Sequence, residues 1–549
     1  MNPPYSAKKW NKAGLKISDP RFEIAGVLPP DSKGDYAFLL HGLFHLSQDG
    51  TMAIVLPHGV LFRGGSEGEI RKRLIDKNHI DAVLGLPSNL FTNTGIPVTI
   101  LILKKDRALD EPILIIDASN EFKKVGKQNI LQEKHIARLV DTYVERKAKE
   151  GYSALISRED ILENDYNLNI PRYVSPLSDD IAHDVDAHLL GGIPVKNIED
   201  LPVLNSLVGD ILWAGLEETR PGYFELTQDI EELKTEVFES AKLKGLSENL
   251  SQATRGYLAQ YFELISGLEA GSDSRQLMEK MLLDIKGILA DYSFVDAYNG
   301  YQLVAEIWGN SLNEDTEVIA LTGFYEAARS MEANMVSKGS GDKKRMVQEG
   351  WISSLIPNEL IVRQIFSLES LKIEELKQKL AETEAELDDL LEAAKVEESE
   401  ENEILYDCIT KNKEGEAGNS FVAKAVKDQL KNYDKNSDEY PLLKKTEKLL
   451  AEKSALGSKI RKKAAELEEA VAERIPKLNK QEVEALAFEK WFGSLEEDML
   501  KLIRQPLEEE LDKLKLLKTR YSSTLKDLEE EGKKVEKSFE SLLAELVVS

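Results

Sequence analysis

The chain has 549 residues, 42% of them hydrophobic, and a formal net charge of −27 at pH 7. The length predicts roughly three or four domains, and the apolar content excludes wholesale disorder. The acidity disfavours binding of nucleic acid over a large surface, because phosphate contacts need Lys and Arg. The single cysteine, Cys408, excludes a disulfide framework and a cysteine-based zinc site. The sequence has no signal-peptide pattern and no apolar run of membrane-spanning length, so it predicts a cytoplasmic protein without a membrane segment.

The first residues form a short motif with a definite chemical use, Asn2-Pro3-Pro4-Tyr5. Each proline fixes φ and lacks an N–H, so the run is extended and holds its carbonyl oxygens in place. The Asn2 amide carbonyl and a main-chain carbonyl can together accept both hydrogens of an exocyclic amine, while the Tyr5 ring offers a stacking face. The motif predicts an acceptor site for the amino group of a flat heterocycle, and a plain N-terminal loop is the alternative.

Residues 36–117 alternate between helical and strand-like patterns. Helical spacing over 36–46 precedes a continuous apolar run at 51–56, which is typical of a strand buried on both faces of a parallel sheet. The Ser66-x-x-Glu69 spacing then predicts a capping box at the start of a helix.

Three further apolar runs, at 80–86, 98–103 and 113–117, predict strands. The segment 87–97, which joins the first two, is too long for a tight hairpin turn. Because strands alternate with helices, we expect a parallel or mixed α/β sheet.

The rest of the chain has a mainly helical pattern. Residues 129–152 have helical spacing, 165–173 form a polar and aromatic segment that we expect to be extended, and 337–343 have the Gly and Ser content of an exposed loop. Two seams of apolar residues follow, with spacings that alternate between three and four. The first consists of Ile373, Leu376, Leu380, Thr383, Leu387, Leu390 and Ala394, and the second of Leu507, Leu511, Leu514, Tyr521, Leu525, Leu528, Val535, Phe539, Leu542 and Leu546. In the second seam, Lys518 and Gly532 occupy two of the positions. Such seams predict coiled-coil-like helices that need a partner.

In order along the first third of the chain, these segments resemble the modification (methyltransferase) subunit of type I restriction-modification systems, a family of adenine-N6 DNA methyltransferases. Asn2-Pro3-Pro4-Tyr5 is similar to the catalytic Asn/Asp-Pro-Pro-aromatic motif of that family. The further segments that carry the resemblance are 35–39 with His41, 53–65, 86–91 with 94–97, 165–174, 188–189 and 191–194.

The resemblance implies catalysis on an adenine that is flipped out of the duplex. Asn2, Pro3, Pro4 and Tyr5 would be the catalytic residues: the Asn2 side chain and the Pro3 carbonyl would hold the N6 hydrogens, and Tyr5 would stack on the ring. Phe91 would be the second aromatic of the base pocket, or alternatively a loop residue that plugs the sheet edge. S-adenosyl-L-methionine would be the methyl donor, with contacts from Asn2 and Pro4, and no metal is implied.

The resemblance also implies partners and a domain plan. The partners would be double-stranded DNA, a DNA-specificity subunit and a restriction subunit. The expected domains are 1–128, the C-terminal half of a methyltransferase catalytic domain; 129–195, a closing segment; 196–360, a helical domain; and 361–549, a long-helix, partner-binding region. The expected fold class is thus a partial Rossmann-like α/β methyltransferase sheet, followed by a large all-α region.

Four histidines and one arginine have weaker signals. His183 and His188 are five residues apart, so we do not expect them to share a helix face as metal ligands, and we expect no zinc site. We expect His41 and His58 to shape the fold rather than transfer protons. Arg63 before a helix start could bind an anion, although a plain strand-to-helix turn fits as well.

One part of the family pattern is not found before Asn2. A complete family member has a helical domain and a Gly-rich donor-binding loop there. We therefore expect a C-terminal portion of such a subunit, from a split gene, a truncated gene model or a remnant. A separate N-terminal methyltransferase fragment would complete it. The strand at 52–56 would then have an unpaired edge, and the chain alone would bind S-adenosyl-L-methionine poorly.

Two hypotheses remain open from the sequence. In the first, the chain is the catalytic part of an adenine methyltransferase. In the second, it is a catalytically inactive scaffold that binds a specificity subunit through its C-terminal helices. Adenine methylation by a reconstituted complex would distinguish them.

Overall fold

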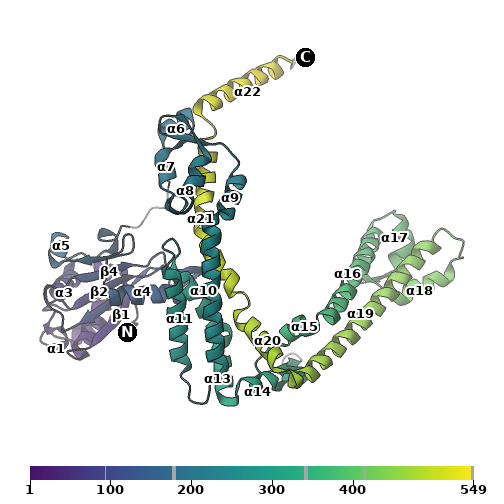
Figure 1. The fold of residues 1–549 in the computed structure, drawn as a ribbon, viewed down its shortest axis with the longest axis horizontal. Coiled ribbons are helices and arrows are strands. Elements are labelled where there is room, and N and C mark those ends of the chain that lie inside the picture. Colours follow the sequence, from purple (N-terminus) through teal and green to yellow (C-terminus); the bar gives the residue numbers. More distant parts are fainter. Residues whose placement is uncertain (93, 176–180, 339–343, 412–415, 546–549) are drawn as a thin grey trace. The chain divides into compact units, whose positions relative to one another are not determined.

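The computed structural model describes residues 1–92, 94–175, 181–338, 344–411 and 416–545. The chain divides into two compact units. The first consists of Met1–Tyr257, Met278–Glu306 and Leu495–Ser549, and the second of Leu258–Leu277 and Ile307–Ser494. Each unit therefore joins segments that are far apart in the sequence, as the colours of Figure 1 show. The domain boundaries expected from the sequence stay predictions.

The first unit opens with a five-stranded mixed sheet in the order β1-β3-β2-β4-β7. The strands are β1 (Thr51–Pro57), β2 (Ile80–Gly85), β3 (Val98–Lys104), β4 (Ile113–Asp117) and β7 (Ser153–Ile156). β2 and β4 run parallel, whereas β3 pairs antiparallel with both β1 and β2, and β7 pairs antiparallel with β4. The expected mixed sheet and four of its strands are confirmed; the sequence interpretation missed β7, a strand of only four residues.

β1 differs from the expected strand, which was to be parallel and buried on both faces. It pairs antiparallel with β3 and stands at the end of the strand order. Thr51 and Ala53 are exposed, whereas Met52, Ile54 and Leu56 are buried. The expectation was wrong because apolar content alone does not distinguish a central strand from an edge strand with one covered face.

Two hydrophobic clusters occupy the two faces of this sheet. One face is covered by α1 (Pro20–Glu23), α2 (Asp35–His45), α3 (Gly65–Asp76) and α5 (Arg158–Glu163). Leu39, Ile70 and Leu74 of these helices pack there against Ile54 and Val83 of the strands. The other cluster joins strand residues to Leu139 of α4 (Glu133–Glu145), with Tyr5 and Phe91 packed against it. This second face supports the candidate site.

Several local predictions need correction. The N-cap of α3 is Gly64, and no side chain caps the helix, so Ser66 lies inside the first turn and the expected capping box is absent. The helical pattern over 129–152 contains α4 but begins with the strand β6 (Gln128–Ile130), which pairs with β5 (Lys123–Val125).

The segment expected to be extended at 165–173 is instead a turn followed by a short 3-10 helix, Ile170–Arg172. Asp165 and Tyr166 have positive φ there. Hydrogen bonds between residues close in sequence, such as that from the Tyr173 hydroxyl to the Asn167 carbonyl at 2.5 Å, hold this compact conformation.

The remainder of the first unit is mainly helical. Its elements are α6 (Val185–Leu190), α7 (Val195–Glu199), α8 (Pro202–Ala214), α9 (Ile230–Glu239), α10 (Ala241–Ser266), α11 (Ser274–Ala290), α12 (Ala297–Ile307), α21 (Leu495–Tyr521) and α22 (Leu525–Glu545), with a small sheet of β8 (Ile193–Pro194), β9 (Leu216–Arg220) and β10 (Tyr223–Leu226). α10, α11 and α12 continue into the second unit.

The second seam is not continuous. Leu507, Leu511 and Leu514 are buried in α21, but the helix ends at Tyr521, and α22 begins at Leu525. Leu528, Val535, Phe539 and Leu542 of α22 are more than half exposed. Leu546 lies outside the described residues.

The second unit has a long helical hairpin. α16 (Ser367–Lys395) and α19 (Tyr440–Arg474) pack side by side, which confirms the first seam and identifies its partner as a helix of the same chain (Figure 1). The other elements of this unit are α13 (Asn313–Thr322), α14 (Phe324–Arg329), α15 (Asn358–Ile365), α17 (Glu400–Leu405), α18 (Ala423–Asn432), α20 (Lys480–Phe492), and the strands β11 (Met331–Lys338), β12 (Arg345–Ser353), β13 (Ile409–Lys411) and β14 (Ala417–Phe421).

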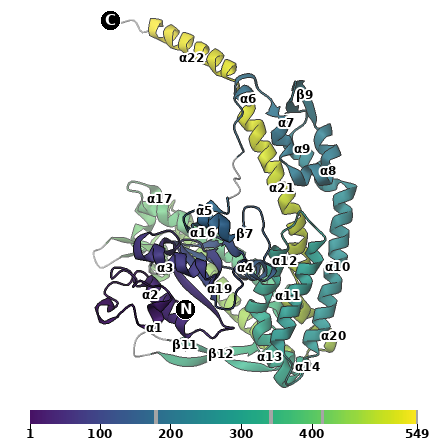
Figure 2. The same ribbon diagram turned by 90° about the vertical axis from the view of Figure 1, so that its left-hand side faces the viewer.

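The hairpin of β11 and β12, visible in Figure 2, was not expected in a helical region. Of the loop expected at 337–343, the first two residues end β11, and 339–343 lie outside the described residues. Within the part of the chain that the structure describes, no helix has the length and apolarity needed to cross a membrane.

Candidate functional site

The candidate site lies at the edge of the sheet where β1, β2 and β4 end and β3 begins. Pro57 at the end of β1 pairs with Val98, Gly85 at the end of β2 pairs with Thr99, and Gly85 also pairs with Asp117. Ligands of open α/β sheets bind outside the carboxyl ends of the strands, because loops there are supported by a rigid scaffold. A ligand site is therefore expected at this edge.

Met1 brings the N-terminal motif to this edge. Its amino group donates to the Ala53 carbonyl at 2.6 Å, and its carbonyl accepts from the Val55 N–H at 3.0 Å. These two bonds form a parallel bridge opposite Ile54, on the side of β1 away from β3. The chain after Met1 thus runs alongside β1 toward Pro57, so Asn2 to Tyr5 emerge at the carboxyl edge, and the edge of β1 is paired at one residue.

The four residues of the motif differ in exposure. Pro3 is buried, Asn2 and Pro4 are exposed, and Tyr5 is partly buried, which raises the pKa of its hydroxyl. The Tyr5 hydroxyl donates to the Asn2 side-chain carbonyl at 3.0 Å. A carbonyl oxygen has two lone pairs, so Asn2 can still accept a second hydrogen bond. The Tyr5 contact orients the amide without using up its acceptor capacity.

Phe91 lies beside the motif. Its ring centroid is 6.0 Å from that of Tyr5, with an interplanar angle of 77°, an edge-to-face arrangement. Both rings pack against the hydrophobic cluster of this sheet face. The structure thus brings together the Asn2 amide and two aromatic side chains, Tyr5 and Phe91, which are 86 residues apart in the sequence.

A short hairpin braces the loop that carries Phe91. The Asn129 side chain donates to the Ser88 carbonyl at 2.9 Å, and its backbone N–H donates to the Asn89 carbonyl at 3.0 Å. Asn129 is 8% exposed, so both bonds are shielded from water. Sequence reasoning missed this residue, although Gly126-Lys127 between two short polar strands is a recognisable two-residue hairpin turn.

A buried carboxylate fixes the chain directly after the motif. Asp35 is fully buried at the start of α2 and accepts from the Ser6 N–H at 2.6 Å. The Arg63 guanidinium lies 3.2 Å from Asp35 and 3.5 Å from Glu67, whose pKa is raised by burial. Because Arg63 pairs with these two carboxylates, its positive charge is neutralised within the fold. This favours a plain strand-to-helix turn over an anion-binding site.

His58 and His41 have different surroundings. The His58 ring, through Nε2, hydrogen-bonds to the Val98 carbonyl at 2.9 Å, and the same carbonyl accepts from the Leu86 N–H. Burial lowers the pKa of His58, so its neutral form is favoured. His41 is exposed on α2, with its ring 4.4 Å from that of His45. His58 therefore acts here as a structural link between β1 and β3.

His183 and His188 do not share a helix face, as expected from their spacing, but their rings are in contact. Their Nδ1 and Nε2 atoms are 2.9 Å apart, and their rings are stacked. The contact forms because His183 precedes α6 rather than lying on it, and the chain folds back onto the helix. Within the described ranges, no third His, Cys, Asp or Glu joins them as a metal-binding group.

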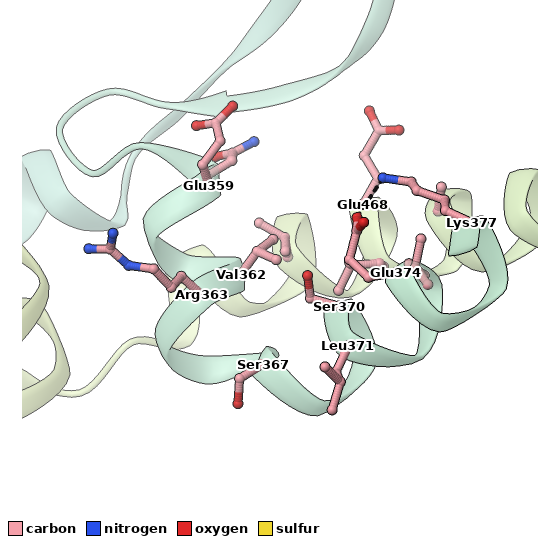
Figure 3. Close-up of a pocket in the computed structure, with 14 residues that line it drawn as sticks. Glu359, Val362, Arg363, Ser367, Ser370, Leu371, Glu374, Lys377 and Glu468 are labelled. Atoms are coloured by element: carbon pink, nitrogen blue, oxygen red, sulfur yellow. Dashed lines mark hydrogen bonds and ion pairs between the residues drawn. The ribbon is translucent and has the colours of Figure 1, made fainter. Parts of the chain in front are cut away.

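The second unit has a hollow of about 650 Å³, unrelated to the predicted residues. Figure 3 shows it between α15, α16 and α19, with Val362 and Leu371 among the apolar residues and Glu359, Glu374 and Lys377 among the charged ones. The sequence interpretation placed no site residue here.

Comparisons with known proteins match the region around the candidate site. Residues 1–180 match a protein-family model described as N-6 DNA Methylase. The chain is 46% identical over 176 residues to the methylase subunit of the type I restriction enzyme MpnII of Mycoplasma pneumoniae. It is 37% identical over 191 residues to the methylase subunit of the type I restriction enzyme MjaVIII of Methanocaldococcus jannaschii.

These alignments cover only part of each protein. They include 32% and 34% of this chain, and the chain spans about a third of the length of both curated relatives. Among solved structures, the type I restriction-modification methyltransferase subunit of Streptococcus thermophilus is 54% identical over 32% of this chain and 37% of its own, with a TM-score of 0.31.

Proposed function

We propose that this chain acts in adenine-N6 methylation of DNA as the modification subunit of a type I restriction-modification complex, on the premise that residues 1–180 belong to the N-6 DNA methylase family. The observation that supports the proposal is the juxtaposition of Asn2, Tyr5 and Phe91 at the carboxyl edge of the sheet. An amide acceptor beside two aromatic rings suits a flat base with an amino group.

The proposed roles combine this geometry with the family resemblance. Tyr5 and Phe91 hold an adenine that has left the base stack, since extruded bases are bound by stacking and by hydrogen bonds to their polar edge. The Asn2 side-chain carbonyl and the Pro3 main-chain carbonyl accept the two N6 hydrogens. These hydrogen bonds strengthen as positive charge develops on the nitrogen, so they stabilise the transition state more than the bound base.

The described residues fit the base better than they fit a methyl donor. S-adenosyl-L-methionine is the methyl source that the family implies. Asn2 and Pro4 are exposed at the carboxyl edge and are the residues proposed to contact it. The strands β1, β2 and β4 are followed by His58-Gly59, Leu86-Pro87 and Ala118-Ser119, and none of these turns is the Gly-rich loop that cradles a nucleotide-like donor. We propose that a separate N-terminal methyltransferase fragment supplies further donor-binding residues.

α22 supports the proposed protein partners. Its apolar residues Leu528, Val535 and Phe539 are exposed at helical spacing, and Glu529 and Glu536 flank them. In a second parallel copy, Glu531 of one helix would lie beside Glu536 of the other, so the helix favours a different partner with basic flanks. We propose that this partner is the DNA-specificity subunit, with the restriction subunit joining the same complex.

The same helix supports a second candidate function. If the complex forms but transfers no methyl group, the chain is a scaffold for the specificity subunit. Leu528→Ala should reduce capture of the specificity subunit by the full chain under both candidate functions. Adenine methylation by the complex distinguishes the two.

The test of the methyltransferase proposal compares two substitutions at one position. In the chain co-expressed with its specificity subunit and any donor-binding fragment, Asn2→Ala removes the acceptor, and Asn2→Asp retains side-chain oxygens that can accept the N6 hydrogens. We expect Asn2→Ala to lower the rate of N6-methyladenine formation by about 10²-fold or more, and Asn2→Asp to retain measurable activity. Mass spectrometry of nucleosides from the DNA measures both.

Binding of DNA by the complex is the control, and it should be equal for the two variants. The proposal fails if Asn2→Ala methylates as fast as the parent complex, or if no complex containing the parent chain methylates adenine.

A further inference from the structure

The long hairpin of the second unit has an unusual distribution of charge. The chain as a whole has a net charge of −27, but the segments 377–381 and 453–465 together contain seven Lys and Arg and no Asp or Glu. Glu452 and Glu466 bound the longer segment. Positive charge is therefore concentrated in these two segments of an otherwise acidic protein.

The two segments lie at the same level because α16 and α19 run antiparallel. Lys453 of α19 forms an ion pair with Glu384 of α16 at 2.9 Å. Farther along, Lys377 of α16 lines the same hollow as Ala464 and Glu468 of α19 (Figure 3). The segment 377–381 is consequently opposite the C-terminal half of 453–465.

The basic belt is defined as Lys377, Lys379, Lys459, Arg461, Lys462 and Lys463, all of which are exposed. Four of these side chains have partners: Lys377 pairs with Glu374 at 2.6 Å, Lys463 with Glu466 at 2.7 Å and Lys462 with Glu466 at 3.9 Å, and Arg461 Nε donates to the Gly457 carbonyl at 3.2 Å. Among the described residues, Lys379, Lys459 and Arg461 form no ion pair, and Lys462 is 79% exposed. Exposed ion pairs are weak and exchange readily with another anion.

The residues between these cations indicate the class of ligand. Apart from the cations, the exposed side chains of 453–465 are small: Ser454, Ala455, Ser458, Ala464 and Ala465; the two large apolar residues, Leu456 and Ile460, are partly buried. A protein interface of this size needs large apolar or aromatic side chains at its centre, and the belt offers none among them. Contacts to a nucleic-acid backbone need only cations and polar groups, and small side chains allow the phosphates to approach.

The geometry points to the basic belt as a binding surface for the phosphate backbone of duplex DNA. Lys459, Lys462 and Lys463 lie on one face of α19, within about 100° of the helix circumference and about 6 Å of its length, a length over which B-DNA presents several phosphate charges. Such a surface holds DNA without reading its sequence. This inference rests on the proposed function only in the choice of DNA as the polyanion.

The test measures the salt dependence of DNA binding by the full chain. The ligand is a fluorescent duplex that lacks any methylation sequence, and binding is followed by anisotropy. The belt variant is Lys459→Gln, Lys462→Gln and Lys463→Gln, on one face of α19; the matched control is Lys533→Gln, Lys534→Gln and Lys537→Gln in the exposed helix α22. Each variant removes three positive charges, and glutamine preserves the helix.

Each lost phosphate contact reduces the slope of log affinity against log salt by about 0.9. Across a fourfold rise in salt, the affinity of the parent chain should therefore fall about 40-fold more than that of the belt variant. The α22 control should follow the parent. Circular dichroism checks that both variants retain their helices.

Equal salt slopes for the belt variant and the parent, or no binding by the parent, would overturn the inference. So would a belt variant that changes self-association in sedimentation while keeping its DNA affinity, because the belt would then be an interface between copies. None of these results bears on the proposed function, which is tested separately by adenine methylation with the complex.

Discussion

At the end of β1, the imidazole of His58 is held by the Val98 carbonyl, at an Nε2 to oxygen distance of 2.9 Å. Burial lowers its pKa, and burial also lowers the pKa values of His79 and His135 in the same sheet domain. A histidine that is held neutral in the fold must take up a proton when the chain unfolds at lower pH. These residues therefore link the stability of the sheet to pH.

The sign of the pH effect follows from proton binding. The unfolded chain binds more protons than the folded chain between the lowered pKa of His58 and its ordinary value of about 6.5. Stability is fully present above about pH 6.5 and is lost as pH falls through this window. We expect His58→Gln, which keeps an N–H donor for Val98, to lose less stability than the parent between about pH 7.5 and about pH 5.5.

Urea unfolding at several pH values measures this difference. His41→Gln, on the exposed side of α2, is the matched control and should follow the parent. If His58→Gln and the parent lose stability equally over this range, His58 is not the linked group.

At the scale of helices, burial decides which apolar seams stabilise the fold. Leu511 in α21 is 2% exposed, whereas Leu528 in α22 is 56% exposed, although both belong to the same pattern in the sequence. The interruption between Tyr521 and Leu525 divides the pattern into a structural half and an unpartnered half.

This division predicts opposite results for one type of substitution. Leu511→Ala should destabilise the chain by about 2–5 kcal/mol because it leaves a cavity. Leu528→Ala should change the free energy of unfolding by less than about 0.5 kcal/mol but weaken capture of a partner. Urea unfolding measures the first effect and pull-down with the specificity subunit the second. Equal destabilisation by the two variants would contradict the division.

At the scale of the whole molecule, four residues are proposed to hold the base, whereas only Asn2 and Pro4 are proposed to contact the methyl donor. The parallel bridge between Met1 and Ile54 shows that the outer edge of β1 can pair with a parallel segment. A segment that added to this edge would stand beside the Asn2-Pro3-Pro4-Tyr5 motif, where donor-binding residues are needed.

We therefore expect weak or unmeasurable binding of S-adenosyl-L-methionine by this chain alone. Isothermal titration calorimetry measures it, with the chain co-expressed with its partners as the comparison sample. Tight stoichiometric binding by the isolated chain would show that the described residues suffice for the donor.

The sequence by itself determined the elements whose signals are local. The strands around Ile54, Val83, Leu101 and Ile115 and the helix of the first seam were found because hydrophobic spacing reflects the faces that each element buries. The Asn2-Pro3-Pro4-Tyr5 motif and Phe91 were singled out from residue types, their order and the family resemblance. What these signals had in common is that neighbours in sequence carry them.

Only the tertiary structure decided which distant residues meet. The placement of Asn129 under the Phe91 loop, of Asp35 under Ser6, and of His183 against His188 depends on how the chain folds back. The edge position of β1 and the pairing of α16 with α19 likewise depend on elements far along the chain. Hydrophobic spacing states that a face is buried but not what covers it, so these contacts required the folded molecule.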